Sequence, residues 1–140
     1  MSEPKDGLKY TLTLDPTQAR VVIAALDLYS RVGMRQFDAI GSAITFELRR
    51  EGDEREAIDA ILEARKAFDV AKQALGFGSG SSLGIRGAPR PARIAYDVQQ
   101  VLRQRVANQE SPGGWSTWHD DPLPTDDHPL ATCTSHKEPA

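Results

Sequence analysis

The sequence is poor in the residues that mark secreted, membrane-spanning or nucleic-acid-binding proteins. Its 140 residues include one cysteine, Cys133, which excludes an intramolecular disulfide and fits a reducing compartment. It has no run of about 18 apolar residues and no charged segment followed by an apolar leader, so neither a membrane span nor secretion is indicated. The net charge of -3 argues against long nucleic acid as a partner. We therefore expect a cytoplasmic protein.

The composition is that of one ordinary globular domain, with 39% hydrophobic and 26% charged residues. Residues 1–120 carry nearly all of the periodic apolar pattern, and we expect them to form a single compact domain. Residues 121–140 are acidic and proline-rich, which predicts a tail with little to bury.

The longest helical pattern runs from Asp15 to about residue 49. Asp15 offers a carboxylate to the free amides of a helix start, the proline after it fits the first turn, and Gln18 completes a capping box. Apolar residues recur on two neighbouring faces of this helix, while Gly33 and Gly41 indicate a kink or a close helix contact. Two apolar faces are typical of a central helix or of a helix at a subunit contact, so we predict a homo-oligomer, a dimer or larger.

Four further segments complete the expected fold. Alternation over Leu8–Leu14 predicts a strand, and Trp115–His119 predicts a short strand that pairs with it. A capping-box pattern opens a second helix at Asp53–Glu56, and Gly76 is expected to end it as a C-terminal cap. Pro91 opens a third helix that runs to about Ala107. The predicted fold is α+β and mostly helical, with three helices, one of them long and central, and a small antiparallel sheet.

The stretch from Gly76 to Pro91 is rich in glycine and serine, and a loop of this length is usually functional or disordered. Its backbone amides suggest a phosphate cradle. However, no Gly-Lys-Ser/Thr follows and no strand precedes it, so a nucleotide-hydrolysing P-loop is not expected.

Charge is distributed unevenly near the C-terminus. Between Arg86 and Arg105 Asp97 is the one acidic residue among the arginines, which stand at positions 86, 90, 93, 103 and 105. After Gln109 the acids outnumber the bases. An arginine-rich segment in an acidic protein favours a small anionic ligand over long nucleic acid, although arginines also often pair with local acids.

One face of the third helix aligns an aromatic ring, amides and a guanidinium, from Tyr96, Gln99, Gln100 and Arg103. These groups can bind a base or ribose together with a phosphate. The alternative is an ordinary surface helix with a tyrosine at the edge of the core.

No metal site or catalytic group is expected. The histidines and Cys133 near the C-terminus lack the tight spacing of metal ligands, so we predict a solvated tail rather than a metal site. The ordered part has no nucleophile with a base, and no spaced pair of carboxylates. We therefore predict a binding protein rather than an enzyme, with no cofactor.

Four short segments carry a resemblance to a family of small phage-encoded proteins. They are ALDLYSRVGMRQF at 25–37, SLGI at 82–85, ARIAYDVQQVLR at 92–103, and PGG at 112–114. Together with their order along the chain, they resemble the first-described Thoeris anti-defence family, whose members sequester cyclic ADP-ribose-type immune signals.

The resemblance implies a signal bound without cleavage in a recessed pocket at a subunit contact. It implies an aromatic ring on the base, which falls on Phe77, and arginines on the phosphates, which fall on Arg31 and Arg103. Leu83 stands where relatives have an aromatic residue, and Gly76–Ser82 where they have a proline-rich loop, so the identity of the cyclic nucleotide stays open.

The sequence therefore leads to two functional hypotheses. The first is a phage anti-defence protein in the host cytoplasm that sequesters a cyclic ADP-ribose isomer, with ligand-binding residues Arg31, Phe77, Arg86, Tyr96, Gln99 and Arg103. The second is a protein-binding inhibitor or accessory module that acts through an exposed helix face.

Overall fold

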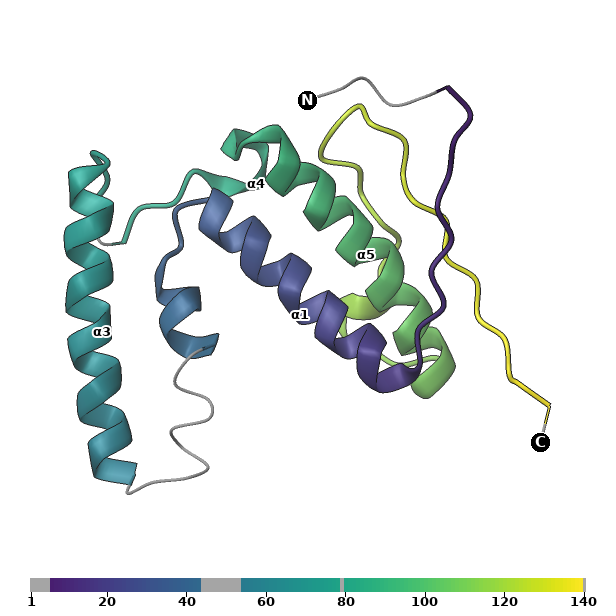
Figure 1. Ribbon diagram of the computed structural model, residues 1–140, viewed down its shortest axis with the longest axis horizontal. Coiled ribbons are helices and arrows are strands. Elements are labelled where there is room, and N and C mark those ends of the chain that lie inside the picture. The colour runs from purple at the N-terminus through teal and green to yellow at the C-terminus, as the bar shows by residue number, and fades with distance from the viewer. Residues whose placement is uncertain (1–5, 44–53, 79, 140) are drawn as a thin grey trace.

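The computed structural model describes residues 6–43, 54–78 and 80–139, and within them every regular element is a helix (Figure 1). In chain order they are α1 (Pro16–Gly33), a short helical segment at 38–43, α3 (Glu54–Ala74), α4 (Gly84–Gly87), α5 (Arg90–Glu110) and the 3-10 helix η1 (Thr117–His119). None of the described helices combines the length and apolar character that crossing a membrane requires.

The predicted α+β fold with a small antiparallel sheet is wrong. Residues 8–14 form no strand, and of their apolar side chains only Leu14 is half-buried. In the partner segment Trp115 is 99% exposed, and the residues after it form η1. A two-stranded sheet is marginal in water unless one face packs on something, and neither segment has such a support.

Helix α1 begins as its sequence predicts. The Asp15 carboxylate accepts a hydrogen bond of 2.8 Å from the Gln18 amide, and the Gln18 side-chain oxygen accepts one of 3.0 Å from the Asp15 amide. These reciprocal bonds satisfy two donors that a helix start leaves free. The capping box is therefore confirmed.

The single long helix predicted from Asp15 to about residue 49 is wrong, because α1 ends at Gly33. The Gln36 amide donates to the Arg31 carbonyl at 2.8 Å and the Arg35 amide to the Val32 carbonyl at 3.0 Å, which is the Schellman pattern. Arg35 holds the left-handed position of this motif with φ of 69°, where glycine is usual. Residues beyond 43 in the predicted helix lie outside the described part of the chain.

Helices α1 and α5 lie side by side and antiparallel, and they form the main packed unit (Figure 1). Small side chains dominate their buried surface, and Ser30 is the largest side chain that is fully buried in the described residues. A Cβ atom placed on Gly33 would collide with the Ala92 methyl. The close helix contact predicted at Gly33 is therefore present, and it joins the last turn of α1 to the first turns of α5.

The opposite end of this pair is fastened by Arg20. Its guanidinium forms an ion pair with Glu110 at the end of α5, and it also lies 5.8 Å from the centre of the Trp118 ring in η1. Cation–π contacts of this kind contribute about 0.5–1 kcal/mol at exposed sites. One side chain of α1 thus fixes α5 and η1 together.

Segment 38–43 and α3 form a second unit, which we call the α3 hairpin. In Figure 1 α3 stands apart from the α1/α5 pair, and Phe68 lies 3.6 Å from the position of a Cβ on Gly41. The chain leaves and re-enters the α1/α5 pair at one place. There the Leu83 backbone amide donates to the Met34 carbonyl at 3.0 Å, and the side-chain amide of Gln36 donates to the Ser82 hydroxyl at 3.0 Å. These bonds hold the two connecting segments together.

Candidate functional site

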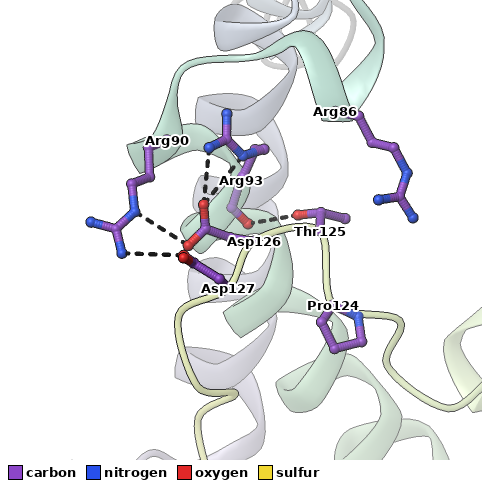
Figure 2. A pocket seen from close by; sticks show the side chains of 7 residues that line it. All are labelled: Arg86, Arg90, Arg93, Pro124, Thr125, Asp126 and Asp127. Carbon is purple, nitrogen blue, oxygen red and sulfur yellow. Dashed lines mark hydrogen bonds and ion pairs between the residues drawn. The ribbon is translucent and has the colours of Figure 1, made fainter.

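An open hollow lies at the start of α5, between that helix, α4 and the segment that follows η1 (Figure 2). Its volume is about 800 Å³, within the range of about 300–1,000 Å³ that small-molecule sites occupy. Three arginines and two aspartates give it its chemistry, and we call it the arginine hollow; it is lined by Arg86, Arg90, Arg93, Pro124, Thr125, Asp126 and Asp127.

The three arginines come from two adjacent helices. Arg86 lies on α4, while Arg90 and Arg93 lie in the first turns of α5, where a spacing of three residues places them on one side. Figure 2 shows Arg86 across the hollow from the other two. The positive end of the α5 dipole adds to the charge of these guanidinium groups.

The other wall is formed by residues 121–128, which run along α5 and which we call the C-terminal strap. Gln100 pairs with the Leu123 peptide, donating to its carbonyl at 3.0 Å and accepting from its amide at 3.0 Å. The Asp97 carboxylate accepts from the Thr125 amide at 3.0 Å and from the Thr125 hydroxyl at 2.8 Å. Both Asp97 and Gln100 are buried, so the first part of the predicted tail is docked on the helical body through hydrogen bonds.

The Asp126 side chain is buried and accepts several hydrogen bonds. Its carboxylate accepts from Arg93 at 3.0 and 3.3 Å, from Arg90 at 3.3 Å and from the His128 amide at 2.9 Å, and its side chain is 2% exposed. The His128 amide, followed by Arg93 and Arg90, lowers the pKa of Asp126 from 3.8 to about 2, although burial acts in the opposite direction. Arg93 also donates to the Ala88 carbonyl at 2.6 Å, which fixes its guanidinium.

The acidic residues after position 109 therefore meet the arginine-rich segment in space. Arg90 and Arg93 are paired with Asp126, and Asp127 lies 3.7 Å from Arg90. Arg86 has no polar partner among the described residues, so the hollow keeps one guanidinium free. Pairing of the arginines with local acids, the alternative left open by the sequence, is what occurs at Arg90 and Arg93.

Two predicted site residues, Arg31 and Gln99, meet through a third. Arg31 donates to Asp27 at 2.8 Å and Gln99 donates to the same carboxylate at 3.2 Å, which links α1 to α5. Arg31 also donates to Gln36 at 3.0 Å. Gln99 is 3% exposed and its side-chain oxygen has no partner within the described residues. Gln99 therefore joins the two helices, whereas Arg31 bonds to α1 and to the turn that follows it.

Two others, Tyr96 and Arg103, lie against each other on α5. The Arg103 guanidinium is 5.8 Å from the centre of the Tyr96 ring, which confirms that the two share a face. Asp97 and Glu110, the nearest acids to Arg103 in the sequence, are paired with other residues, Asp97 with Thr125 and Glu110 with Arg20. Gln100, predicted on the same face, is turned to the C-terminal strap instead.

Phe77 lies in the turn that ends α3 and is half-buried, and it does not line the arginine hollow. Of the six predicted site residues, Arg86 is therefore the one that lines it. Within the described residues no group of three or more histidine, cysteine or acidic side chains is placed to hold a metal ion.

No protein-family model, no curated protein and no solved structure matches the chain. The site must therefore be interpreted from its own residues. Arg90, Arg93, Asp126 and Asp127 were absent from the predicted site, yet the opposite signs of the two neighbouring segments were a signal for their pairing.

Proposed function

We propose that the protein binds a small phosphate-bearing anion in the arginine hollow and holds it without cleaving it. In keeping with the family resemblance, we propose a cyclic ADP-ribose-type signal as the ligand and a phage anti-defence role in the host cytoplasm. The observation that carries the binding proposal is the placement of Arg86, Arg90 and Arg93 around one open hollow with Arg86 unpaired in the described structure.

The chemistry of the hollow supports an anion of this kind. Guanidinium groups hold phosphate oxygens through paired hydrogen bonds, and three of them oppose two carboxylates here, which leaves one positive charge. A volume of about 800 Å³ accommodates a nucleotide-sized molecule. Because Arg93 and Arg90 are already oriented by Asp126, these two side chains lose little conformational freedom on binding.

The test is calorimetry with cyclic ADP-ribose isomers and cyclic dinucleotides on the wild type and on Arg86→Ala. Hydrogen bonds to charged groups contribute about 1.5–3 kcal/mol, so loss of Arg86 should weaken binding roughly tenfold to a few hundredfold. Arg105→Ala is the matched control, since Arg105 is exposed and lies about 18 Å from Arg93 along α5. Equal affinities of the two variants would place binding outside the hollow.

Sequestration is separated from catalysis by recovering the ligand. Protein saturated with the signal is denatured, and the released molecule is weighed by mass spectrometry. We expect the intact signal, and a cleaved product would contradict binding without cleavage.

A second candidate function, a module that binds a partner protein, is favoured by the α3 hairpin. In its described residues, two apolar side chains that lie one helical turn apart on α3 are exposed, Ile58 at 45% and Leu62 at 48%. Replacing both with glutamine should abolish capture of a stoichiometric host protein while leaving anion binding unchanged. No captured protein from host lysate, together with nucleotide binding, would exclude this candidate.

We also propose that the chain forms a homo-oligomer, a dimer or larger. Val21 and Tyr29 on α1 are more than half exposed beside the buried row that faces α5. Light scattering at micromolar concentration should give at least twice the chain mass of 15.3 kDa, and a mass of one chain would contradict this.

A further inference from the structure

We infer that the two adjacent carboxylates of the C-terminal strap have opposite effects on the arginine hollow: Asp126 positions its arginines, whereas Asp127 competes with the anionic ligand for Arg90. The inference rests on the proposed function of the hollow as an anion site. Asp127 is thus the residue that limits the affinity for the anion, and Asp126 is the residue that orients the arginines before it binds.

Asp126 has the contacts of a structural element. Its side chain is 2% exposed and accepts from two arginines and from the His128 amide. Thr125, the preceding residue, is bonded to Asp97 and to the Arg93 carbonyl, so Asp126 is carried on a fixed backbone. A ligand that displaced the Asp126 carboxylate would break its bonds to the two arginines and to the His128 amide. We therefore expect Asp126 to stay in place when an anion binds.

Asp127 has the contacts of a displaceable group. Its side chain is 95% exposed, and its ion pair with a terminal nitrogen of Arg90 has a distance of 3.7 Å, too long for a hydrogen bond. Ion pairs this exposed contribute little to stability. In Figure 2 Asp127 lies beside Arg90 on the wall opposite Arg86.

An anion that bridges Arg86 and Arg90 would enter the place that the Asp127 carboxylate faces. The outer nitrogen of Arg90 can serve the ligand only if Asp127 swings away, and a carboxylate left nearby repels the incoming charge. Asp127 thereby selects ligands by their charge, because a ligand with one weak negative charge gains little binding free energy by replacing this carboxylate. A ligand with two phosphate groups gains more, so the hollow should favour diphosphates over monoanions.

The experiment is calorimetry with inorganic pyrophosphate at low ionic strength, on the full-length wild type and on Asp127→Asn, Asp126→Asn and Asp120→Asn. Asp120 is exposed and lies outside the hollow, so its variant controls for the change in net charge. Asp127→Asn should bind pyrophosphate about threefold to tenfold more tightly, and this gain should shrink as salt is added. Its melting temperature should equal that of the wild type.

Asp126→Asn should bind pyrophosphate more weakly and melt earlier, because Arg90 and Arg93 lose the group that orients them. Unchanged or weaker binding by Asp127→Asn would overturn the inference, as would equal tightening in all three variants, which would show that net charge alone governs affinity. If the wild type binds pyrophosphate and Asp127→Asn does not differ, only this inference fails. Absence of heat from every protein and every anion contradicts the proposed function itself.

Discussion

Replacing Asp97 with asparagine should detach the C-terminal strap from α5. The Asp97 side chain is buried, and its carboxylate accepts the amide of Thr125 at 3.0 Å and its hydroxyl at 2.8 Å. It also accepts from Gln100 at 3.3 Å. Asparagine keeps the shape but removes the negative charge. With its oxygen at the Oδ1 position, it places an NH2 group where Oδ2 of Asp97 accepts from the Thr125 amide at 3.0 Å.

The magnitude follows from the kind of bond that is lost. Hydrogen bonds to charged groups contribute about 1.5–3 kcal/mol each, and asparagine recovers part of this because it carries no charge to desolvate. We therefore expect the strap to be destabilised by about 1.5–3 kcal/mol. If the strap unfolds together with α5, the melting temperature should fall by roughly 5–12 °C for a domain of this size.

Amide hydrogen exchange reports on the strap directly. Protection of the Thr125 amide should fall by roughly tenfold to a hundredfold in Asp97→Asn, since each 1.4 kcal/mol corresponds to about a factor of ten. Asp120→Asn removes the same charge from an exposed position and should melt like the wild type. Normal melting and normal Thr125 protection in Asp97→Asn would refute the account of how the strap is held.

Three further predictions concern the close helix contact, the pH and the salt concentration. Gly33→Ala should lower the unfolding free energy by about 1–3 kcal/mol in denaturant titration, because the new methyl would overlap Ala92, whereas Gly41→Ala should be neutral or slightly stabilising since its Cβ meets Phe68 at 3.6 Å. The folded pKa of Asp126 lies below its ordinary value, so its contribution to stability is present above pH 3.8 and lost as the pH falls toward 2. The difference in melting temperature between wild type and Asp126→Asn should disappear over that range. Raising the salt concentration should weaken anion binding in the hollow, and affinity that is independent of salt would argue against charge recognition.

Helix boundaries that depend on local signals were predicted well. The Asp15 capping box begins α1, and Gly76 ends α3 with φ of 87° in a Schellman motif, as a glycine at that position indicates. The end of α1 uses the same motif, but Arg35 takes the left-handed position. Arginine does not indicate that conformation in a sequence. The apolar periodicity continues beyond residue 33, so it predicted a helix longer than α1.

Features that depend on distant partners were predicted poorly. Alternation of apolar and polar residues over 8–14 indicates a strand only if another strand is present to pair with it, and no sheet forms among the described residues. The arginines of the hollow and the acids of the strap were both recognised in the sequence. Their pairing depends on how the strap folds back along α5, through Asp97 and Gln100, and periodicity contains no information on that path.

The central claim is that the anion binds at the arginine hollow, and the NMR signals of the arginine Nε–H groups test it most directly. As pyrophosphate is added to labelled protein, the signals of Arg86 and Arg90 should shift and saturate, while that of Arg105 should not move. Shifts confined to Arg31 and Arg103 would contradict the claim and place the ligand outside the hollow.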